Sequence, residues 1–238
     1  MDKFAKYLPS IKKSFPDYRF SWEIATEIIN GEVAKKPVWL DIGARNNARL
    51  QTHQGSELAV GLDPEARDDI YTDSRTKFIR GSAYDLPFKE STYDFVTSRY
   101  TFEHLEFPEK ALAEIERVLK LGGLFLLQTT NKNSPLLVIA RMIPFGIKKQ
   151  LLKLLFKENP SGTFRTYYKL NTPSKIEKFD SGLQGSGKLK LEKMYLIEDI
   201  LCDSKILFTM SFNLYKLTRL FGWKSLEGNM VMVFKKVE

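Results

Sequence analysis

The stretch from Val38 to Asn47 constrains the fold more than any other part of the chain. Its sequence, VWLDIGARNN, reads as a short buried strand that carries an acid, Asp41, at its end and turns at Gly43. A second apolar run, 58–62, is followed by another acid, Asp63, about twenty residues later. This is the pattern of a nucleoside-binding α/β unit. We therefore predict such a unit in the first half of the chain.

Strand and helix patterns alternate as far as residue 130, and this alternation predicts a parallel sheet with right-handed crossovers. The expected strands are 38–42, 58–62, 76–80, 93–98 and 124–129, and the expected helices are 18–31, 49–53 and 108–120. After residue 131 the pattern predicts mostly loop over 160–187, with a short helix at 173–179. A strand at 189–197, a helix at 204–221 and a strand at 229–236 follow.

Composition narrows the class of protein. The 238 residues include one cysteine, Cys202, and two histidines, so an internal disulfide is excluded and no metal site is expected. Neither a signal peptide nor an apolar run near the roughly 20 residues of a spanning helix is evident. We predict a cytoplasmic protein that is either soluble or peripheral to a membrane.

The excess of positive charge lies entirely in the C-terminal part. Residues 1–130 hold 18 Lys and Arg against 20 Asp and Glu, whereas residues 131–238 hold 19 against 9. A basic surface of this kind indicates an anionic partner. Lipid head groups and a phosphorylated glycan carrier fit this charge; nucleic acid is not expected, since no RNA-binding module is recognisable.

Six short motifs resemble, in their order, those of the class I S-adenosylmethionine (SAM) methyltransferases. They are DIG at 41–43, GLD at 61–63, DLPF at 85–88, YDFV at 93–96, FEHL at 102–105 and EIERVLKLGG at 114–123. The resemblance implies an α/β, Rossmann-like sheet of seven mostly parallel strands with an antiparallel last strand, 229–236, and helices on both faces. It also implies one domain, 1–238, with a SAM-binding core at 36–131 and a helical, acceptor-side part at 132–228.

The resemblance implies SAM as the cofactor and assigns residues to it. Asp41 would face the cationic methionine end, Gly43 would let the backbone approach the ligand, and Asp63 would accept from both ribose hydroxyls. The adenine would lie against the loop formed by Ser82, Ala83, Asp85 and Leu86.

The sequence departs from the family pattern at two points. Ala44 to Asn47 stand where further glycines are usual, and Ser82 stands where an acid commonly binds adenine. The alternative for Asp41 and Asp63 is that they cap the helices that follow their strands. A dehydrogenase would need a G-x-G-x-x-G turn, which this loop lacks.

Two candidates for catalysis follow the fourth expected strand, at the edge of the sheet where ligands bind. His104 is the better general base and Glu103 the second candidate. The alternative is a structural histidine at a helix start. Tyr167 and Tyr168 lie in a polar and aromatic loop that either covers the acceptor site or forms a simple aromatic cluster.

Two segments in the basic half are amphipathic. In 135–157 an apolar run precedes a helical pattern with leucines on one face and lysines on another, and 206–223 places aromatic residues among cations. Such helices lie flat in a membrane interface, here the anionic inner face. The alternative is that both pack on the sheet and leave their lysines in water.

The layout of the C-terminal part, with the YYKLNTP segment at 167–173, is loosely similar to methyltransferases of cell-envelope glycan pathways. It implies O-methylation of a glycan or of a lipid-linked sugar. Two alternatives stay open: a methyltransferase for a hydrophobic, quinone-like small molecule, and a degenerate fold that serves as a binding or membrane-docking protein. The oligomeric state is not determined by the sequence.

Overall fold

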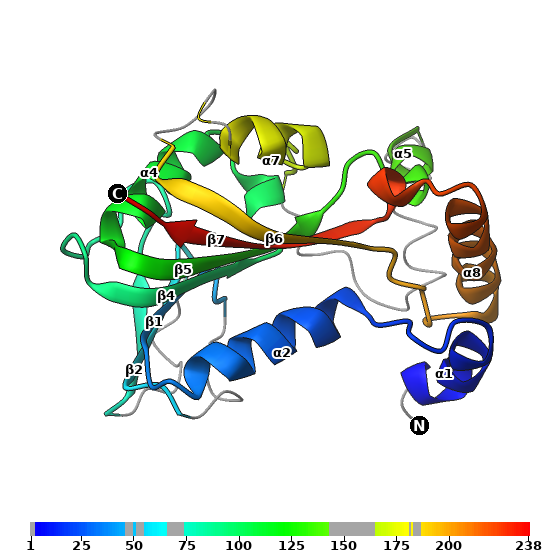
Figure 1. Ribbon diagram of the computed structural model, residues 1–238, viewed down its shortest axis with the longest axis horizontal. Helices are drawn as coiled ribbons and strands as arrows, with labels where there is room; N and C mark the ends of the chain where they lie inside the picture. The colour runs from blue at the N-terminus through cyan, green and yellow to red at the C-terminus, as the bar shows by residue number, and fades with distance from the viewer. Residues whose placement is uncertain are drawn as a thin grey trace.

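The structure, a computed structural model, describes residues 3–45, 50, 55–65, 74–142, 165–180, 182 and 187–238 (Figure 1). One seven-stranded sheet runs through it, in the order β3-β2-β1-β4-β5-β7-β6. Its strands are β1 Val38–Ile42, β2 Leu58–Asp63, β3 Thr76–Arg80, β4 Tyr93–Arg99, β5 Leu119–Thr130, β6 Leu189–Ile197 and β7 Asn229–Lys236.

The strand directions confirm the expected fold class. The pairs from β3 through β2, β1 and β4 to β5 are parallel, whereas β7 lies antiparallel between β5 and β6. The carboxyl ends of β1, β2, β4 and β5 therefore share one edge of the sheet. Ligands bind at this edge in open α/β sheets.

Helices cover both faces of the sheet, as expected. Helix α2, Ser21–Val33, packs Ala25 and Ile29 against Trp39 and Phe95 on one face. Helix α4, Pro108–Val118, packs its apolar stripe into the core on the other face. Both stripes follow the helical period, and that spacing is why the sequence revealed these helices.

The remaining helices lie mostly in the C-terminal part. They are α5 Pro135–Met142, α7 Pro173–Asp180, α8 Lys205–Leu220 and two short 3₁₀ helices, η1 Phe102–His104 and η2 Lys224–Leu226. The predicted helix at 173–179 and the predicted helix at 204–221 are confirmed to within one residue at each end. The predicted helix at 49–53, apart from Leu50, and the lysine-rich half of 135–157 lie outside the described residues.

Helix α1, Lys3–Ser14, was not expected from the sequence, because lysines and Pro9 interrupt its apolar pattern. It is held by tertiary contacts: the ring of Tyr7 stacks on Phe208 of α8 with centroids 4.2 Å apart. Phe15 meets Tyr215 of the same helix edge to face at 4.8 Å. Helices α1 and α8 thus pack on each other at one end of the molecule (Figure 1).

The predicted boundary between helix 108–120 and strand 124–129 was wrong. Helix α4 ends at Val118 and β5 begins at the next residue, so Gly122 and Gly123 lie inside the strand. Gly122 has a φ of +78°, and the pairing of β4 with β5 shifts register there. A Cβ on Gly123 would lie 3.1 Å from the carbonyl oxygen of Asp94. These glycines form an irregularity in the strand rather than a helix end.

Candidate functional site

The turn after β1 requires glycine. Gly43 has a φ of +79°, and a Cβ there would lie 2.0 Å from Oγ1 of Thr101. The N–H groups of Gly43 and Ala44 both donate to the carbonyl oxygen of Leu62, at 2.8 and 3.2 Å. The turn is therefore fixed against the end of β2, and glycine is what lets the side chain of Thr101 pack against it.

Arg45 occupies the left-handed position that a second glycine usually supplies. Its φ is +52° and the residue is exposed. Left-handed backbone is uncommon for a residue other than glycine or asparagine. Asn46 and Asn47 lie outside the described residues.

Asp63 joins two loops at the end of β2. Its Oδ2 accepts from the N–H of Arg45 at 3.0 Å, and its Oδ1 accepts from the N–H of Glu65 at 2.9 Å. The carboxylate is only partly buried, and each oxygen keeps a second lone pair. Asp63 thus fixes the glycine turn, and its predicted contact with ribose stays a prediction.

Asp41 is more deeply buried than the sequence indicated. Only 1% of the residue is exposed, and its Oδ1 accepts from Oγ1 of Thr97 at 2.6 Å. That hydroxyl in turn accepts from Nε1 of Trp39 at 2.9 Å. The side chain therefore lies between β1 and β4, beneath the turn. A contact between Asp41 and the methionine end of SAM stays a prediction. Because Asp41 is buried, a contact through a water molecule is more favourable than a direct contact.

The predicted adenine loop is compact. Oγ of Ser82 accepts from the N–H of Tyr84 at 3.2 Å, and its carbonyl accepts from the N–H of Asp85 at the same distance. Ala83 and Leu86 are buried, whereas Ser82 and Asp85 are exposed. Tyr84 in turn accepts, at its hydroxyl, from the N–H of Glu106 at 2.9 Å.

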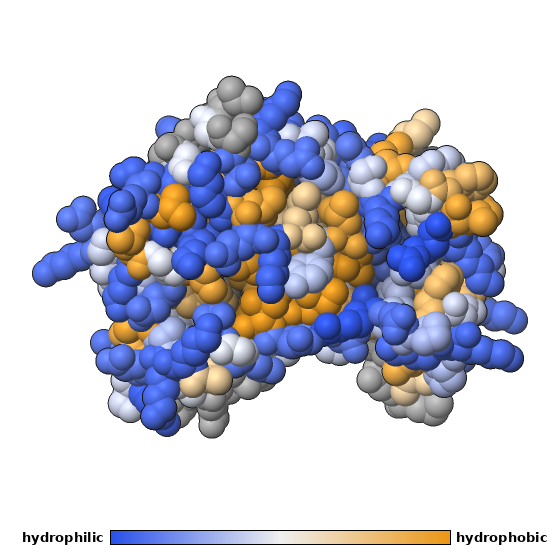
Figure 2. Space-filling model, in the orientation of Figure 1, coloured by the Kyte–Doolittle hydropathy of each residue, from blue (hydrophilic) through white to orange (hydrophobic). Residues whose placement is uncertain are grey.

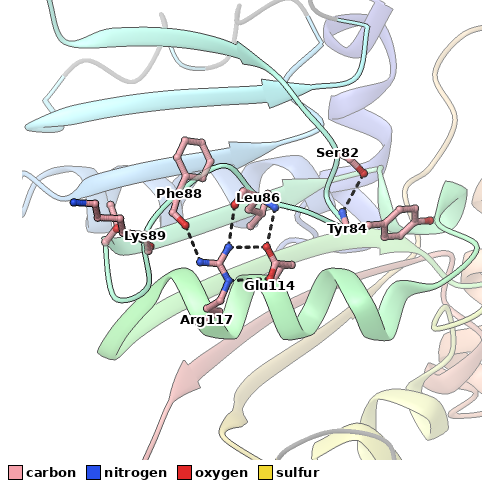
Figure 3. A network of polar contacts seen from close by, with 8 residues as sticks. Ser82, Tyr84, Leu86, Phe88, Lys89, Glu114 and Arg117 are labelled. Carbon is pink, nitrogen blue, oxygen red and sulfur yellow. Dashed lines mark hydrogen bonds and ion pairs between the residues drawn. The ribbon is translucent and has the colours of Figure 1, made fainter.

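An ion pair on α4 holds this loop (Figure 3). Arg117 forms a bidentate pair with Glu114, at 2.8 and 2.7 Å, and also donates to the carbonyls of Leu86 and Phe88. Glu114 accepts from the N–H of Leu86 at 2.7 Å. Hydrogen bonding to Arg117 lowers the pKa of Glu114, so the pair stays charged. The sequence motif at 114–123 includes Glu114 and Arg117, but the motif alone did not predict that this pair holds the loop.

The two catalytic candidates differ in accessibility. Nδ1 of His104 lies 2.9 Å from the carbonyl oxygen of Arg165, which can only accept. The neutral ring therefore carries its proton on Nδ1 and its lone pair on Nε2, as a general base requires. Glu103 is 5% exposed, and burial raises its pKa. Glu103 is thus placed to position its neighbours rather than to exchange protons with a substrate.

A hydrogen-bond chain ties the loop after residue 165 to the sheet. Oγ1 of Thr129 donates to Glu103 at 2.8 Å, and Nδ2 of Asn171 donates to that hydroxyl at 2.6 Å. The carbonyl of Glu103 accepts from the N–H groups of Tyr167 and Tyr168, at 2.8 and 3.2 Å. The two tyrosines are therefore fixed beside η1, next to His104. The sequence did not indicate the roles of Thr129 and Asn171, because the hydrogen bond between them depends on the fold.

A second polar group lies at the same edge of the sheet. Nε2 of Gln128 donates to the hydroxyl of Tyr100 at 2.9 Å and to Oγ of Ser21 at 3.0 Å. Asp199 accepts from the N–H of Ser21 at 2.7 Å. Burial raises the pKa of Tyr100 to about 12. These contacts anchor the start of α2 where β4 and β5 end, and no sequence motif pointed to them.

A cavity of about 400 Å³ opens between α4 and α7. Its walls are apolar where Pro108, Leu112, Leu170 and Phe179 line them, and cationic where Lys169 and Lys175 do; Glu109 also lines it. Burial, and then the like charges of Lys132, Lys169 and Lys178, lower the pKa of Lys175. The cavity thus combines an apolar wall with a cluster of lysines.

Comparison with known proteins finds that part of this chain matches a protein family. Residues 40–127 match the family model described as a methyltransferase domain. The chain is 34% identical over 97 residues to the ubiquinone/menaquinone biosynthesis C-methyltransferase UbiE of Marinomonas sp., covering 40% of this chain and 38% of that protein. It is 31% identical over 109 residues to a demethylmenaquinone methyltransferase of Clavibacter sepedonicus, covering 43% and 44%. The chain thus spans less than half the length of these relatives.

Solved structures share the fold. A SAM-dependent methyltransferase of Methanosarcina mazei superimposes with a TM-score of 0.58 at 15% identity, over 88% of this chain and 97% of that one. A Haloferax volcanii methyltransferase, described as putative and bound to the activator Trm112, gives 0.56 at 16% identity, over 97% and 93%. At these identities the likeness concerns the fold alone.

The sheet order and the glycine turn agree with the family match, which confirms the expected methyltransferase domain over residues 40–127. Within this chain, the methyltransferase domain at 40–127 falls inside the core of 36–131 that the motifs indicated.

Proposed function

We propose that the protein transfers the methyl group of SAM to a hydroxyl of a glycan or lipid-linked sugar. The observation that carries the methyl-transfer part is the grouping of Gly43, Asp63 and the 82–86 loop at one edge of the sheet. In this arrangement the open backbone at Gly43 faces the methionine part, Asp63 accepts from the ribose, and the loop holds adenine.

One feature of the loop supports the adenine assignment. The N–H of Ala83 donates to no other group in the part of the chain that the structure describes, although Ala83 itself is buried. A buried N–H is normally satisfied, so an acceptor atom of the base would complete it.

Methyl transfer needs an acceptor oxygen in line with the sulfonium, where SAM supplies an activated methyl group. Positioning provides much of the rate of such a displacement. With SAM bound, Nε2 of His104 would take the proton of the acceptor hydroxyl. Glu103 holds the Tyr167–Tyr168 segment through its carbonyl, so its role is positional.

The lysine-lined cavity supports a lipid-linked sugar as acceptor. Such molecules carry phosphate between sugar and lipid, and lysine clusters bind phosphate. Lys169 and Leu170 line the cavity directly after the two tyrosines beside His104. An amphiphilic anion thus matches both the apolar and the cationic wall.

A quinol is the second candidate, because two relatives are named as quinone methyltransferases. The match, however, lies in the part of the chain that contains the cofactor-binding motifs. An uncharged quinol would use the apolar wall of the cavity and leave the lysines without a role.

Calorimetry with SAM and with its demethylated product tests the cofactor site. We expect binding of both, and Asp63→Ala should weaken it at least about tenfold, since hydrogen bonds to a charged acceptor contribute about 1.5–3 kcal/mol. Glu65→Ala, which leaves the backbone N–H in place, is the control. Absence of heat with both ligands would favour the degenerate, non-enzymatic alternative.

Transfer of a labelled methyl group tests the acceptor. Purified protein is incubated with labelled SAM and with separate lipid, glycan and quinol fractions. Label that becomes water-soluble after mild acid treatment of the lipid fraction would support a lipid-linked sugar, because acid releases the sugar from its phosphate. Label in the quinol alone would replace the first candidate by the second.

A further inference from the structure

Exposed apolar side chains are concentrated at one end of the molecule. Of the twelve large hydrophobic residues that are exposed in the described part of the chain, nine lie on α5 or on the segment 205–223. We call these nine the docking face: Val138, Ile139, Met142, Ile206, Met210, Leu217, Leu220, Phe221 and Trp223. Scattered exposed hydrophobics need no explanation, but a concentration of this kind marks an interaction site.

The members on α8 form one stripe. Ile206, Met210, Leu217 and Leu220 recur at intervals of four, seven and three residues, the spacing of a single helix face. Leu220 is 77% exposed, and the stacked rings of Phe221 and Trp223 extend the stripe beyond the helix end.

The stripe is not the face by which α8 packs in the protein. That other face presents Phe208, Phe212 and Tyr215 to α1. Helix α8 therefore has two apolar sides, and among the residues that the structure describes only one of them is covered. The alternative expected this helix to pack on the sheet with its lysines in water; among the described residues it packs within the protein, mainly against the N-terminal segment that contains α1.

The charged residues on the three helices at this end are all cations. Helices α1, α5 and α8 contain eight Lys and Arg residues and no Asp or Glu. From 204 to 226 the sequence contains four cations, Lys205, Lys216, Arg219 and Lys224, and no acid. A protein partner would usually meet mixed charge, whereas an anionic lipid surface matches apolar residues ringed by cations.

The two parts of the docking face lie at the same end. The side chain of Asn131, shortly before α5, donates to the carbonyls of Ser225 and Glu227 at 2.8 and 2.9 Å. In Figure 1, α5, α8 and α1 lie at the right-hand end, and Figure 2 shows orange and blue residues intermingled there. This is the end towards which β5 runs.

We propose that the docking face inserts into the interface of a bilayer containing anionic phospholipid. Leucine, methionine and aromatic side chains enter the acyl boundary, and the lysines and arginines contact the head groups. No helix within the described ranges is long and apolar enough to cross a membrane, so binding is interfacial. The sequence predicted membrane contact for the ranges 135–157 and 206–223. The proposal names the side chains within those ranges that would insert, namely the docking face.

Docking places the carboxyl edge of the sheet towards the lipid. A lipid-linked acceptor would then reach the site from the membrane; this consequence rests on the proposed function, whereas the docking itself does not. Binding to vesicles can therefore fail or succeed independently of methyl transfer.

Flotation of the full chain with vesicles tests the proposal. We expect the protein to float with phosphatidylcholine vesicles that contain phosphatidylglycerol, at least about tenfold more tightly than with phosphatidylcholine alone, since each basic residue near the surface contributes appreciably. High salt should reduce the difference. Equal or absent binding to the two vesicle types would overturn the proposal.

Matched variants locate the surface. Leu220→Glu with Phe221→Glu should abolish flotation, whereas Leu121→Glu, at a residue 61% exposed near the start of β5, should leave it unchanged. Lys216→Glu with Arg219→Glu should weaken binding at least about tenfold. The exposed pair Lys77→Glu with Lys89→Glu is its control.

The folding and the self-association of these variants are measured separately from their membrane binding. All variants alter exposed side chains, and their circular dichroism and calorimetric binding of SAM should match those of the parent protein. If Leu220→Glu with Phe221→Glu instead converts a dimer to a monomer while flotation persists, a second copy covers the face and the proposal is wrong.

Discussion

At the scale of single residues, the site is determined by backbone conformation as much as by side chains. Gly43 is required because Thr101 fills the space where a Cβ would stand. Arg45 takes up a left-handed conformation two residues later, where the family pattern has glycine. The departure from the glycine pattern therefore adds a conformational cost to the turn.

Arg45→Gly should stabilise the protein. A left-handed non-glycine residue costs about 1–2 kcal/mol, and glycine costs about 0.5–1 kcal/mol in unfolded-chain entropy, so we expect a net gain of about 0.5–1 kcal/mol. Chemical denaturation measures it. Lys35→Gly, at a residue outside the positive-φ set, should not stabilise. An unchanged or lower free energy of unfolding for Arg45→Gly would contradict this account.

His104→Asn should abolish most of the activity while keeping the local structure. The asparagine amide can still donate to the carbonyl of Arg165, but it supplies no base. We expect kcat to fall by about 10²-fold or more with unchanged affinity for SAM, measured by labelled methyl transfer and calorimetry. A variant with near-normal kcat would mean that His104 is structural.

At the scale of elements, loops at the carboxyl edge are held by neighbours distant in sequence. Helix α4 holds the 82–88 loop through Arg117 and Glu114. The chain through Thr129 and Asn171 holds the 165–172 loop on η1. The strand and helix periods predicted the elements themselves, but the contacts between loops and elements required the fold.

Arg117→Ala should loosen the adenine loop. It removes a bidentate ion pair and two hydrogen bonds to loop carbonyls, so we expect a loss of about 1–3 kcal/mol in stability and weaker binding of SAM. Lys110→Ala, an exposed cation on the same helix, is the control. Thermal unfolding and calorimetry give the two readouts, and a loss of stability with intact SAM affinity would separate the loop from the cofactor site.

At the scale of the whole molecule, buried carboxyls lie after the end of β6 and before the start of β7. Burial raises the pKa of Glu198 to about 8 from its ordinary value of 4.5, and that of Glu227 to about 7. Asp199 is shifted in the same direction by burial. The folded protein therefore retains protons that the unfolded chain releases above pH 4.5, and stability falls as pH rises from there through about 8.

Thermal unfolding as a function of pH checks this prediction. The melting temperature should fall between pH 5 and pH 8, and Glu198→Gln, which stays neutral, should reduce the fall and match the parent protein at the acid end. Glu90→Gln, at an exposed position, should leave the profile unchanged. A melting temperature that rises over this range, with no effect of Glu198→Gln, would contradict the assignment.

The sequence by itself determined the sheet, its core and the cofactor edge. Periodic apolar residues and strand-end motifs are local, so Asp41-Ile42-Gly43 and Gly61-Leu62-Asp63 were readable in one dimension. Tertiary structure alone decided the rest. Helix α1 and the residue after it pack on α8 through Tyr7 and Phe15, and Glu103 accepts from Thr129, which in turn accepts from Asn171. Such pairings join residues far apart in the chain, and their energy appears only when the fold brings them together.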